Sequence, residues 1–544
     1  FDIYAAKYTG SIIVDITLPV FANRGTLMEE THRKKSLFLS FLMLTSVMVG
    51  LVGLMPTAVA ANETTSGTIT GTEVWSGSHT LTGSVIVGTG ANLIVQPGTT
   101  VTMPNGTIID VRGGLCAGDV ACGANGMASN SSRITFNWQD PANASATGYC
   151  AGLFNNQHYN RDPSCNEGIL LRSTVDVGAT KLNHVSITNA YGMPRWVSEI
   201  SEVRYGAIVA QGSSPTMTGL KFTGINTTSL LILDLGRPDI VGGEFTVGDD
   251  ETSLVGSAIQ AYGAGSVLQP LMIDSPVFTG TDKGCGQNDD GRHVLWVEES
   301  FVNVQHAVID NGDYGIRLDD SAGHVSSSTI NTACNGIDVN NKKTAGNNVA
   351  YKLIIEDNKV TTDERSPLTA FNFAWVDFNN NVIDGASGGS GIQISKSQVN
   401  VNGGSIGPIG GWNGIWSIGE SDVRVENVTI QDTAKEPIIA GEYHFGDSGW
   451  NVPSPSENRM YVANSILSSG GGECTGQKAW GGAFPCPAVH AFRSSLTLYN
   501  NDIDIGGGGD GLRAVGAILD VRNNAFNSTG TGAMIRNHDT NYAN

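Results

Sequence analysis

The sequence feature that most constrains the fold is a pair of apolar residues, five positions apart, that recurs along most of the chain. The pairs are Leu182/Ile187, Met217/Phe222, Ile240/Phe245, Ile273/Phe278, Val304/Ile309, Val325/Ile330, Ile355/Val360, Phe378/Ile383, Val401/Ile406, Val425/Ile430, Tyr461/Ile466, Leu498/Ile503 and Val521/Phe526. They recur at a base period of 21 to 24 residues, lengthened in places by 7 to 16 residues. Short strands cannot bury an apolar face alone, so repeats of this kind must stack on one another.

A period of this length, with two or three short strands in each repeat, predicts one turn of a parallel β-helix whose inward side chains form ladders. Leucine-rich repeats have a similar length but need a fixed run of leucines, and propeller blades need about twice the period. One inner position recurs as asparagine, at Asn358, Asn381, Asn464, Asn501 and Asn524. We expect these amides to form a buried ladder at a corner of the coil.

The composition agrees with a chain of strands and turns. Glycine makes up 70 of 544 residues, and only 15% of residues are charged, which suits turns better than long surface helices. The net charge is −20, from 31 basic and 51 acidic residues. Because a phosphate backbone would be repelled, no nucleic acid is expected as a partner.

The N-terminal part of the chain predicts export. Residues 1–27 read as an upstream extension, and residues 28–60 as a signal peptide: a basic start at 32–35, an apolar run from Leu37 to Met55, and small residues before a cleavage site at Ala61. The apolar run is also long enough for an uncleaved membrane anchor. The protein is therefore expected to be secreted or held on the cell surface.

After the leader we expect two regions. Residues 61–170 form an N-terminal cap and first coils with disulfide loops, and residues 171–544 form the repeats, about 13 coils in all. No apolar anchor follows Phe526, so a truncated C-terminus with a missing anchor stays open.

The sequence has eight cysteines, and an even number in an exported chain favours disulfides. Without a C-x-x-C motif, structural zinc is the weaker interpretation. We expect local pairs: Cys116 with Cys122, Cys150 with Cys165, Cys285 with Cys334, and Cys474 with Cys486.

Three segments carry a family resemblance: Leu93 to Val101 (LIVQPGTTV), Ile109 to Leu115, and Ile134 to Phe136. The chain from about 67 to 535 resembles the secreted right-handed parallel β-helix proteins with the pectate-lyase-like fold. That resemblance implies an all-β solenoid, which hosts lyases, hydrolases, epimerases, adhesins and scaffolds. Of the polygalacturonase motifs the chain keeps Asp-Asp and Gly-His, but Val325 follows where a glycine belongs. No catalytic residue is carried over.

Alternation along the Gly-Ile strands predicts which side chains face outward. Coil by coil, this outer column reads Gln260, Trp296, Arg317, Asp338, Gln393, Trp416 and Arg513. The spacing from 296 to 317 to 338 is 21 residues each time, so these coils should lie in strict register. The pair Glu298-Glu299 is then expected to lie on Asp319-Asp320.

Carboxylates on neighbouring coils, about 4.8 Å apart, repel by roughly 3.5 kcal/mol at an effective dielectric near 20 and by under about 1 kcal/mol in water. They either splay into water, or bind calcium through Glu298, Glu299, Asp319 and Asp320, or keep one carboxyl protonated as an acid. In the last case Asp319, Asp320, Glu298 and Arg317 are the candidate catalytic residues. Alternatively, Arg317 neutralises Glu298 or Asp338 and has a structural role.

Tryptophans gather at 412, 416, 450 and 480, where coils carry longer loops. An indole stacks on the C–H face of a sugar, or it packs a loop. His444 and His490 are expected on the surface or in loops. The candidate substrate-binding residues are Trp296, Asp338, Gln393, Trp412 and Trp416.

Three functions remain open. The first is a non-catalytic module that binds a polysaccharide or surface glycan, with no cofactor or with calcium. The second is a polysaccharide lyase, glycoside hydrolase or epimerase acting at the acidic patch. The third is a structural or adhesive surface repeat without a ligand.

Overall fold

The computed structural model describes residues 66–139, 166–225, 227–247, 256–280, 285, 293–341, 352–441, 458–469, 473–474, 484–505, 509–528 and 532–536. All of them belong to the second of the two compact units into which the chain divides, Ala60–Asn544. The expected leader lies outside the described residues. No helix in the described part is long and apolar enough to span a membrane.

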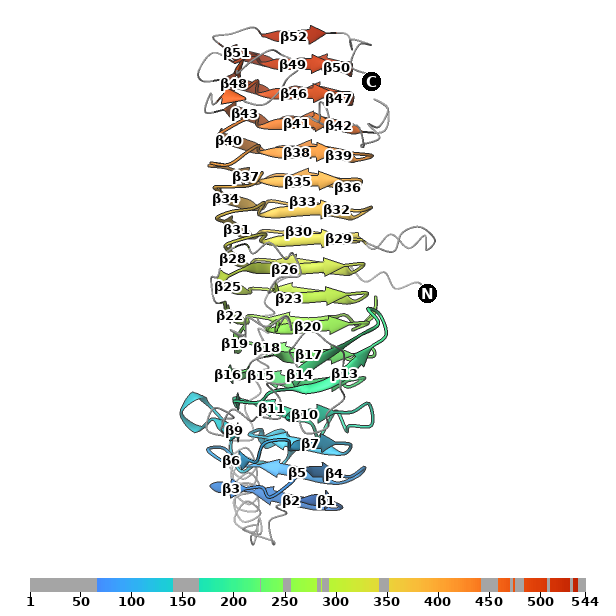
Figure 1. Ribbon diagram of the computed structural model, residues 1–544, viewed down its shortest axis with the longest axis vertical. Helices are drawn as coiled ribbons and strands as arrows, with labels where there is room; N and C mark the ends of the chain where they lie inside the picture. The colour runs from blue at the N-terminus through green and yellow to red at the C-terminus, as the bar shows by residue number, and fades with distance from the viewer. Residues whose placement is uncertain are drawn as a thin grey trace, which may run out of the picture. The chain divides into compact units, whose positions relative to one another are not determined.

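The described chain is a parallel β-helix with three sheets, as the repeat predicted, and of the right-handed kind that the family resemblance implied (Figure 1). Sheet A contains the Gly-Ile strands. Its members are β1 (Gly67–Ile69), β4 (Val85–Val87), β7 (Ile108–Val111), β10 (Gly168–Leu171), β13 (Met193–Val197), β14 (Glu202–Gln211), β17 (Thr228–Leu233), β20 (Ile259–Tyr262), β23 (His293–Glu298), β26 (Tyr314–Asp319), β29 (Ile337–Asn340), β32 (Leu368–Phe371), β35 (Ile392–Ser395), β38 (Ile415–Ile418), β41 (Ile438–Gly441), β46 (Val489–Phe492), β49 (Leu512–Val515) and β52 (Ala533–Arg536).

Sheet B carries the first residue of each apolar pair. Its members are β2 (Thr72–Trp75), β5 (Asn92–Val95), β8 (Gly114–Ala117), β11 (Lys181–Asn183), β15 (Thr216–Thr218), β18 (Asp239–Val241), β21 (Leu271–Asp274), β24 (Phe301–Gln305), β27 (Ala322–Ser326), β30 (Lys352–Glu356), β33 (Trp375–Asn379), β36 (Gln398–Asn402), β39 (Asp422–Glu426), β42 (Arg459–Ala463), β47 (Ser495–Tyr499) and β50 (Ile518–Arg522).

Sheet C carries the second residue of each pair. Its members are β3 (Ser78–Thr80), β6 (Thr100–Met103), β9 (Ile134–Trp138), β12 (Val185–Thr188), β16 (Lys221–Thr223), β19 (Glu244–Thr246), β22 (Val277–Thr279), β25 (Val308–Gly312), β28 (Thr329–Thr332), β31 (Lys359–Thr362), β34 (Val382–Ala386), β37 (Ser405–Ile406), β40 (Thr429–Thr433), β43 (Ile466–Ser469), β48 (Asp502–Ile505) and β51 (Ala525–Ser528). Outside the three sheets lie the hairpin β44 (Glu473–Cys474) and β45 (Phe484–Pro485) and the short 3-10 turns η1 (Val120–Cys122) and η2 (Asn130–Ser132).

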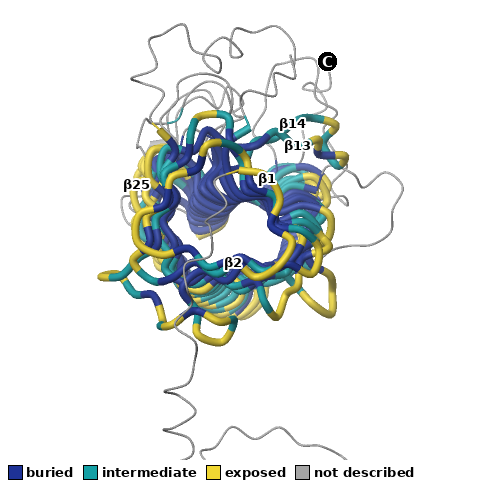
Figure 2. Tube along the Cα trace, turned by 90° about the horizontal axis from the view of Figure 1, so that it is seen from below, coloured by how far each residue is buried: buried dark blue, intermediate teal, exposed yellow. Residues whose placement is uncertain are grey.

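Sheets B and C each contain 16 strands. The 13 expected coils correspond to the strands of sheet B from β11 to β50, and three regular coils, built from β1 to β9, precede them. Seen along the stack, β1, β2 and β25 mark the three sheets around the interior (Figure 2). Inward side chains from all three sheets fill that interior; Phe222, Phe245 and Phe278, for example, stack coil on coil at 5.2 and 5.4 Å between ring centroids.

The outer face of sheet A is partly covered as well. Strands β13 and β14 pair in antiparallel fashion and form a hairpin that extends outside the coils (Figures 1 and 2). An apolar cluster packs outside sheet A at this hairpin, with Met193 and Val197 of β13 against Leu231 and Tyr262. This hairpin has no counterpart in the repeat pattern. Its strand β14 carries Arg204, which contacts Tyr262 on the outer face of sheet A.

The predicted asparagine ladder is confirmed at four of its five positions. The Asn381 side-chain oxygen accepts hydrogen bonds from the Asn358 side chain and backbone, both at 3.1 Å, and Asn501 and Asn524 repeat this arrangement. Asn464 was assigned wrongly, because it is exposed and bonds to Asn500 on the outside of the turn. Ser465 occupies the inner position instead.

That error has a simple origin. In this coil Val462 and Leu467 face inward, in register with Leu498 and Ile503, whereas Tyr461 and Ile466 face outward. The apolar pair was therefore placed one residue too early. Apolar side chains on both faces of a strand leave its register undetermined by alternation alone.

The disulfides Cys116–Cys122 and Cys285–Cys334 are confirmed. Cys486 is also disulfide-bonded. The predicted Cys150–Cys165 pair and the Cys474 side chain lie outside the described residues.

Candidate functional site

The outer face of sheet A has the register that the 21-residue spacing predicted. Trp296 pairs with Arg317, and Arg317 pairs with Asp338. From Gln260 to Arg513 the column reads Gln260, Trp296, Arg317, Asp338, Thr369, Gln393, Trp416, Ile439, His490 and Arg513. Thr369, Ile439 and His490 belong to the same column but were not among the residues predicted for it.

The residues Trp296, Glu298, Arg317, Asp319 and Asp338 form one group on this face, which we call the acidic cluster. Glu298 lies directly beside Asp319 on the next coil. Glu298 is 4% exposed and Asp319 is fully buried, so these carboxylates do not splay into water. Their repulsion must therefore be offset within the protein.

Arg317 supplies much of that compensation. Its Nε donates to both carboxylate oxygens of Asp319, at 3.0 and 2.9 Å. Burial lowers the pKa of Arg317, but the carboxylates of Asp319, Asp338 and Glu298 outweigh it and raise the pKa overall. Arg317 is thus hydrogen-bonded to Asp319 of its own strand, and the charges of Asp338 and Glu298 act on it from the neighbouring coils; the structural role of Arg317 stays a prediction.

Trp296 is buried within the acidic cluster. The guanidiniums of Arg317 and Arg204 lie 5.0 and 5.4 Å from its ring centroid. Arg204 comes from β14 and also donates to the Tyr262 hydroxyl at 3.2 Å. Burial raises the pKa of Tyr262 to about 12, Arg204 opposes this, and the nearby Glu298 adds to it. The hairpin thus helps to close this part of the face, and Trp296 offers little surface to a ligand.

Glu299 and Asp320 lie in turns instead of on the face. Each follows its strand directly and has left-handed backbone, with φ of 49° and 44°. The four carboxylates of the calcium hypothesis are therefore divided between the face and the turn. No group of three or more His, Cys, Asp or Glu side chains in the described part of the chain is arranged to hold a metal ion. The calcium site remains a prediction without geometric support.

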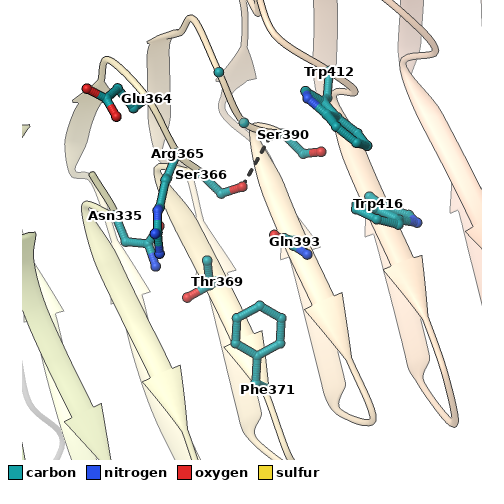
Figure 3. Close-up of a pocket in the computed structure, with 12 residues that line it drawn as sticks. Asn335, Glu364, Arg365, Ser366, Thr369, Phe371, Ser390, Gln393, Trp412 and Trp416 are labelled. Carbon is teal, nitrogen blue, oxygen red and sulfur yellow. Dashed lines mark hydrogen bonds between the residues drawn. The ribbon is translucent and has the colours of Figure 1, made fainter. Parts of the chain in front are cut away.

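Farther along the same face is an open cavity of about 310 Å³, which we call the tryptophan cleft (Figure 3). Its lining consists of Asn335, Glu364, Arg365, Ser366, Thr369, Phe371, Gly388, Gly389, Ser390, Gln393, Trp412 and Trp416. Strands β32, β35 and β38 supply Thr369, Phe371, Gln393 and Trp416, and the turns that precede these strands supply most of the rest.

The turns beside the cleft stack closely because glycine allows it. A Cβ at Gly388 would lie 2.1 Å from the Glu364 carbonyl oxygen, and one at Gly389 would lie 2.4 Å from the Arg365 carbonyl carbon. At both positions any side chain would collide with backbone. These glycines keep the successive turns in contact and so shape this side of the cleft.

Two aromatic rings dominate the cleft. Trp412 and Trp416 are stacked, with ring centroids 5.8 Å apart and planes 18° from parallel. Trp412 is 44% exposed, and the Lys435 ammonium lies 4.3 Å from its ring centroid. Figure 3 places Gln393, Ser366 and Ser390 nearby, so flat apolar surface and polar groups meet in one cavity.

A hydrogen bond joins the cleft to the acidic cluster. Thr369, which lines the cleft, donates its hydroxyl hydrogen bond to Asp338. Of the predicted substrate-binding residues, Gln393, Trp412 and Trp416 meet in the cleft, Asp338 lies at its border, and Trp296 lies in the closed region. Arg365, Glu364 and Asn335 were missed because turn residues carry no strand periodicity.

Other expectations have different outcomes. Trp450, Trp480 and His444 lie outside the described residues. His490 was expected on the surface or in a loop, but it is buried in β46, 3.3 Å from the Glu436 carboxylate. The sequence does not indicate this contact, because the Glu436 partner lies 54 residues away in the chain.

No protein-family model matches the sequence, and no curated protein matches it. Among solved structures, the chain is 12% identical to the Dettilon tailspike protein gp208, with a TM-score of 0.27, covering 75% of this chain and 62% of that one. It is 9% identical to the gp42 tailspike of Acinetobacter phage vb_AbaP_AS12, with a TM-score of 0.30, covering 65% of this chain and 58% of that one.

A third similar structure is the Streptococcus pneumoniae surface protein and adhesin PfbA, at 11% identity and a TM-score of 0.27, covering 86% of this chain and 91% of that one. The chain spans about three fifths of the length of the two tailspikes. At identities this low the likeness concerns the fold alone.

Proposed function

We propose that this protein binds a polysaccharide at the tryptophan cleft without cleaving it. The observation that carries the proposal is the stacked pair Trp412 and Trp416 at the edge of an open cavity that also presents amide, hydroxyl and guanidinium groups. Sugar rings have an apolar C–H face and a polar rim, and this combination of groups complements both.

The burial of the acidic cluster supports binding over catalysis. A general acid or nucleophile must reach the scissile bond, whereas Asp319 is fully buried and held by Arg317. The two disulfides favour an oxidising compartment, as expected for a secreted or surface protein that meets external glycans.

The test is a panel of neutral, acidic and amino polysaccharides incubated with the purified full chain. Binding is measured by affinity electrophoresis, and reducing ends and unsaturated products are assayed in parallel. We expect retention by at least one polysaccharide, no products, and loss of retention in Trp416→Ala. Equal retention of Trp416→Ala and wild type would rule out the cleft.

A second function, cleavage of the bound chain, is favoured by the Thr369–Asp338 hydrogen bond, which connects the cleft to the carboxylates. Replacing Asp319 and Asp320 together by asparagine separates the two functions. A lyase, hydrolase or epimerase loses turnover in this variant and keeps retention, whereas a pure binding protein has no turnover to lose. Chelation tests calcium: if calcium bridges Glu298, Glu299, Asp319 and Asp320, EDTA lowers the melting temperature of the wild type but not of the variant.

A further inference from the structure

A second charged group, well apart in sequence from the cleft, lies at the N-terminal end of sheet A. Arg112 follows β7 directly, and Arg172 follows β10 directly. Because Val111 pairs with Leu171 and the Arg172 backbone N–H donates to the Val111 carbonyl at 3.1 Å, the two arginines lie on neighbouring coils. Two guanidiniums at this spacing repel each other unless an anion lies between them.

The carboxylate of Asp110 is an anion that lies between the two guanidiniums and partly offsets their repulsion. Its carboxylate accepts from Arg112 Nε at 3.1 Å and Nη2 at 2.8 Å, and from Arg172 Nε at 2.7 Å and Nη2 at 3.1 Å. Burial alone would raise the pKa of Asp110, but these hydrogen bonds and charges lower it overall. One carboxylate thus holds two guanidiniums in fixed orientations.

The group is buried on one side and open on the other. The Asp110 side chain is 4% exposed, whereas those of Arg112 and Arg172 are 45% and 40% exposed. Each guanidinium has five N–H donors, and Nη1 of both arginines has no hydrogen-bond partner among the described residues. The open side therefore presents positioned donors to solvent.

A third guanidinium, Arg195 of β13, adds to the positive charge. Burial lowers the pKa of Arg195 most, the charge of Arg172 lowers it further, and Asp110 partly opposes both. Arg112 and Arg172 against Asp110 leave a net excess of one positive charge in a chain whose total is −20. An exposed excess of positive charge is unusual on a protein whose total charge is strongly negative.

We propose that Arg112 and Arg172, held in place by Asp110, form a binding site for a doubly charged tetrahedral oxyanion, sulfate or phosphate. Arginine binds such oxygens through paired N–H groups, and here the guanidiniums are oriented before the anion arrives. The anion supplies the charge that Asp110 alone does not. It is either free in solution or carried as a substituent on a glycan.

The test measures the affinity of the full chain for sulfate and phosphate by calorimetry, at constant ionic strength set with chloride. Arg112→Gln, an exposed turn position, and Arg172→Gln should each weaken sulfate binding about tenfold or more. Arg459→Gln, an exposed arginine of sheet B paired with Asp422, is the control and should bind as the wild type does.

Arg172→Lys separates geometry from charge, because it keeps the positive charge and loses the paired donors. It should also bind sulfate more weakly. No saturable binding by the wild type, unchanged binding in Arg112→Gln, or equal binding by Arg172→Lys and wild type would each overturn the site. Unfolding curves of every variant exclude loss of the fold as the cause.

Two polymers identify the source of the anion. If dextran sulfate displaces sulfate from the wild type and dextran does not, the site accepts the group as a glycan substituent. If neither displaces it, the site takes the free anion. Sulfate binding and its displacement by dextran sulfate do not depend on the tryptophan cleft, so both should be the same in Trp416→Ala as in the wild type.

Discussion

The acidic cluster and the tryptophan cleft lie on the same face of the same sheet, but one is closed and the other is open. In the acidic cluster, the connections vary in length: thirteen residues connect β22 to β23, and a single residue connects β25 to β26. Side chains from neighbouring strands pack on one another there: Arg317 is hydrogen-bonded to Asp319 and lies over the Trp296 ring. In the cleft, five residues connect β34 to β35 and eight connect β37 to β38.

The turns beside the cleft determine what this part of the face presents. They contain Gly388-Gly389 and Gly410-Gly411, which stack as turns beside the sheet and leave a cavity over Thr369 and Gln393. The strands themselves are built alike in both regions. On this face, therefore, the glycine-rich turns shape the open cleft, whereas the charged groups of the acidic cluster are internal because the hairpin and neighbouring side chains cover them.

The largest effect is expected from Asp319→Ala. It leaves the Arg317 guanidinium in the acidic cluster without its hydrogen-bonded carboxylate, and breaking a buried pair in this way costs about 3–5 kcal/mol. The free energy of unfolding in urea measures it. Glu426→Ala removes an equivalent partner from Arg424 on exposed sheet B and should cost under about 1 kcal/mol. Equal costs would mean that the acidic cluster is not closed.

The next effect concerns alkaline pH. The Tyr262 hydroxyl has a pKa of about 12 in the folded protein against 10.0 in the ordinary case. Between these values the unfolded state loses its proton first, so stability is fully present below pH 10 and falls as the pH rises toward 12. The loss is on the order of 2–3 kcal/mol.

Tyr262→Phe is the matched variant for that measurement. Without the hydroxyl, its unfolding free energy should decline less than that of the wild type between pH 10 and 12. Parallel curves for the two proteins would show that Tyr262 is not held neutral by burial, and that solvent reaches this end of the acidic cluster.

The contrast between the acidic cluster and the cleft also explains which of their features could be predicted from the sequence. The register of Trp296, Arg317 and Asp338 followed from a constant spacing, because the side chains of a coil repeat with its length. The burial of Asp319 could not be predicted from that spacing, because it depends on groups from elsewhere in the chain, such as Arg204 of the hairpin.

The cleft was predictable only in part. Gln393 and Trp416 belong to the strand column and were placed correctly, whereas Arg365 and Glu364 come from a turn whose conformation follows no period. Clustering in the sequence identified Trp412 but not its stacking on Trp416. Turn geometry depends on local contacts such as those at Gly388, and these appear only once neighbouring coils are stacked.

In the cleft, substitutions are expected to change the affinity for polysaccharide more than the free energy of unfolding. Trp412→Ala removes an exposed stacking surface, so polysaccharide affinity should fall about tenfold, or about 1.4 kcal/mol, with little change in unfolding. Trp375→Ala, a half-buried tryptophan of sheet B beside Lys352, is the control and should bind normally. A loss of stability in Trp412→Ala equal to that of Asp319→Ala would erase the distinction between the two regions.

The smallest expected effect concerns the contact between a cation and a tryptophan ring, which occurs in both regions. Lys435 lies over Trp412 in the open cleft, and Arg317 lies over Trp296 in the closed acidic cluster. A cation over an exposed ring contributes about 0.5–1 kcal/mol, so Lys435→Met should lower unfolding free energy by no more than that. Arg317→Met should lower it several times more, because it also leaves Asp319 buried without its cation. Urea unfolding of both variants tests this ratio, and equal losses would mean that burial does not set the strength of these contacts.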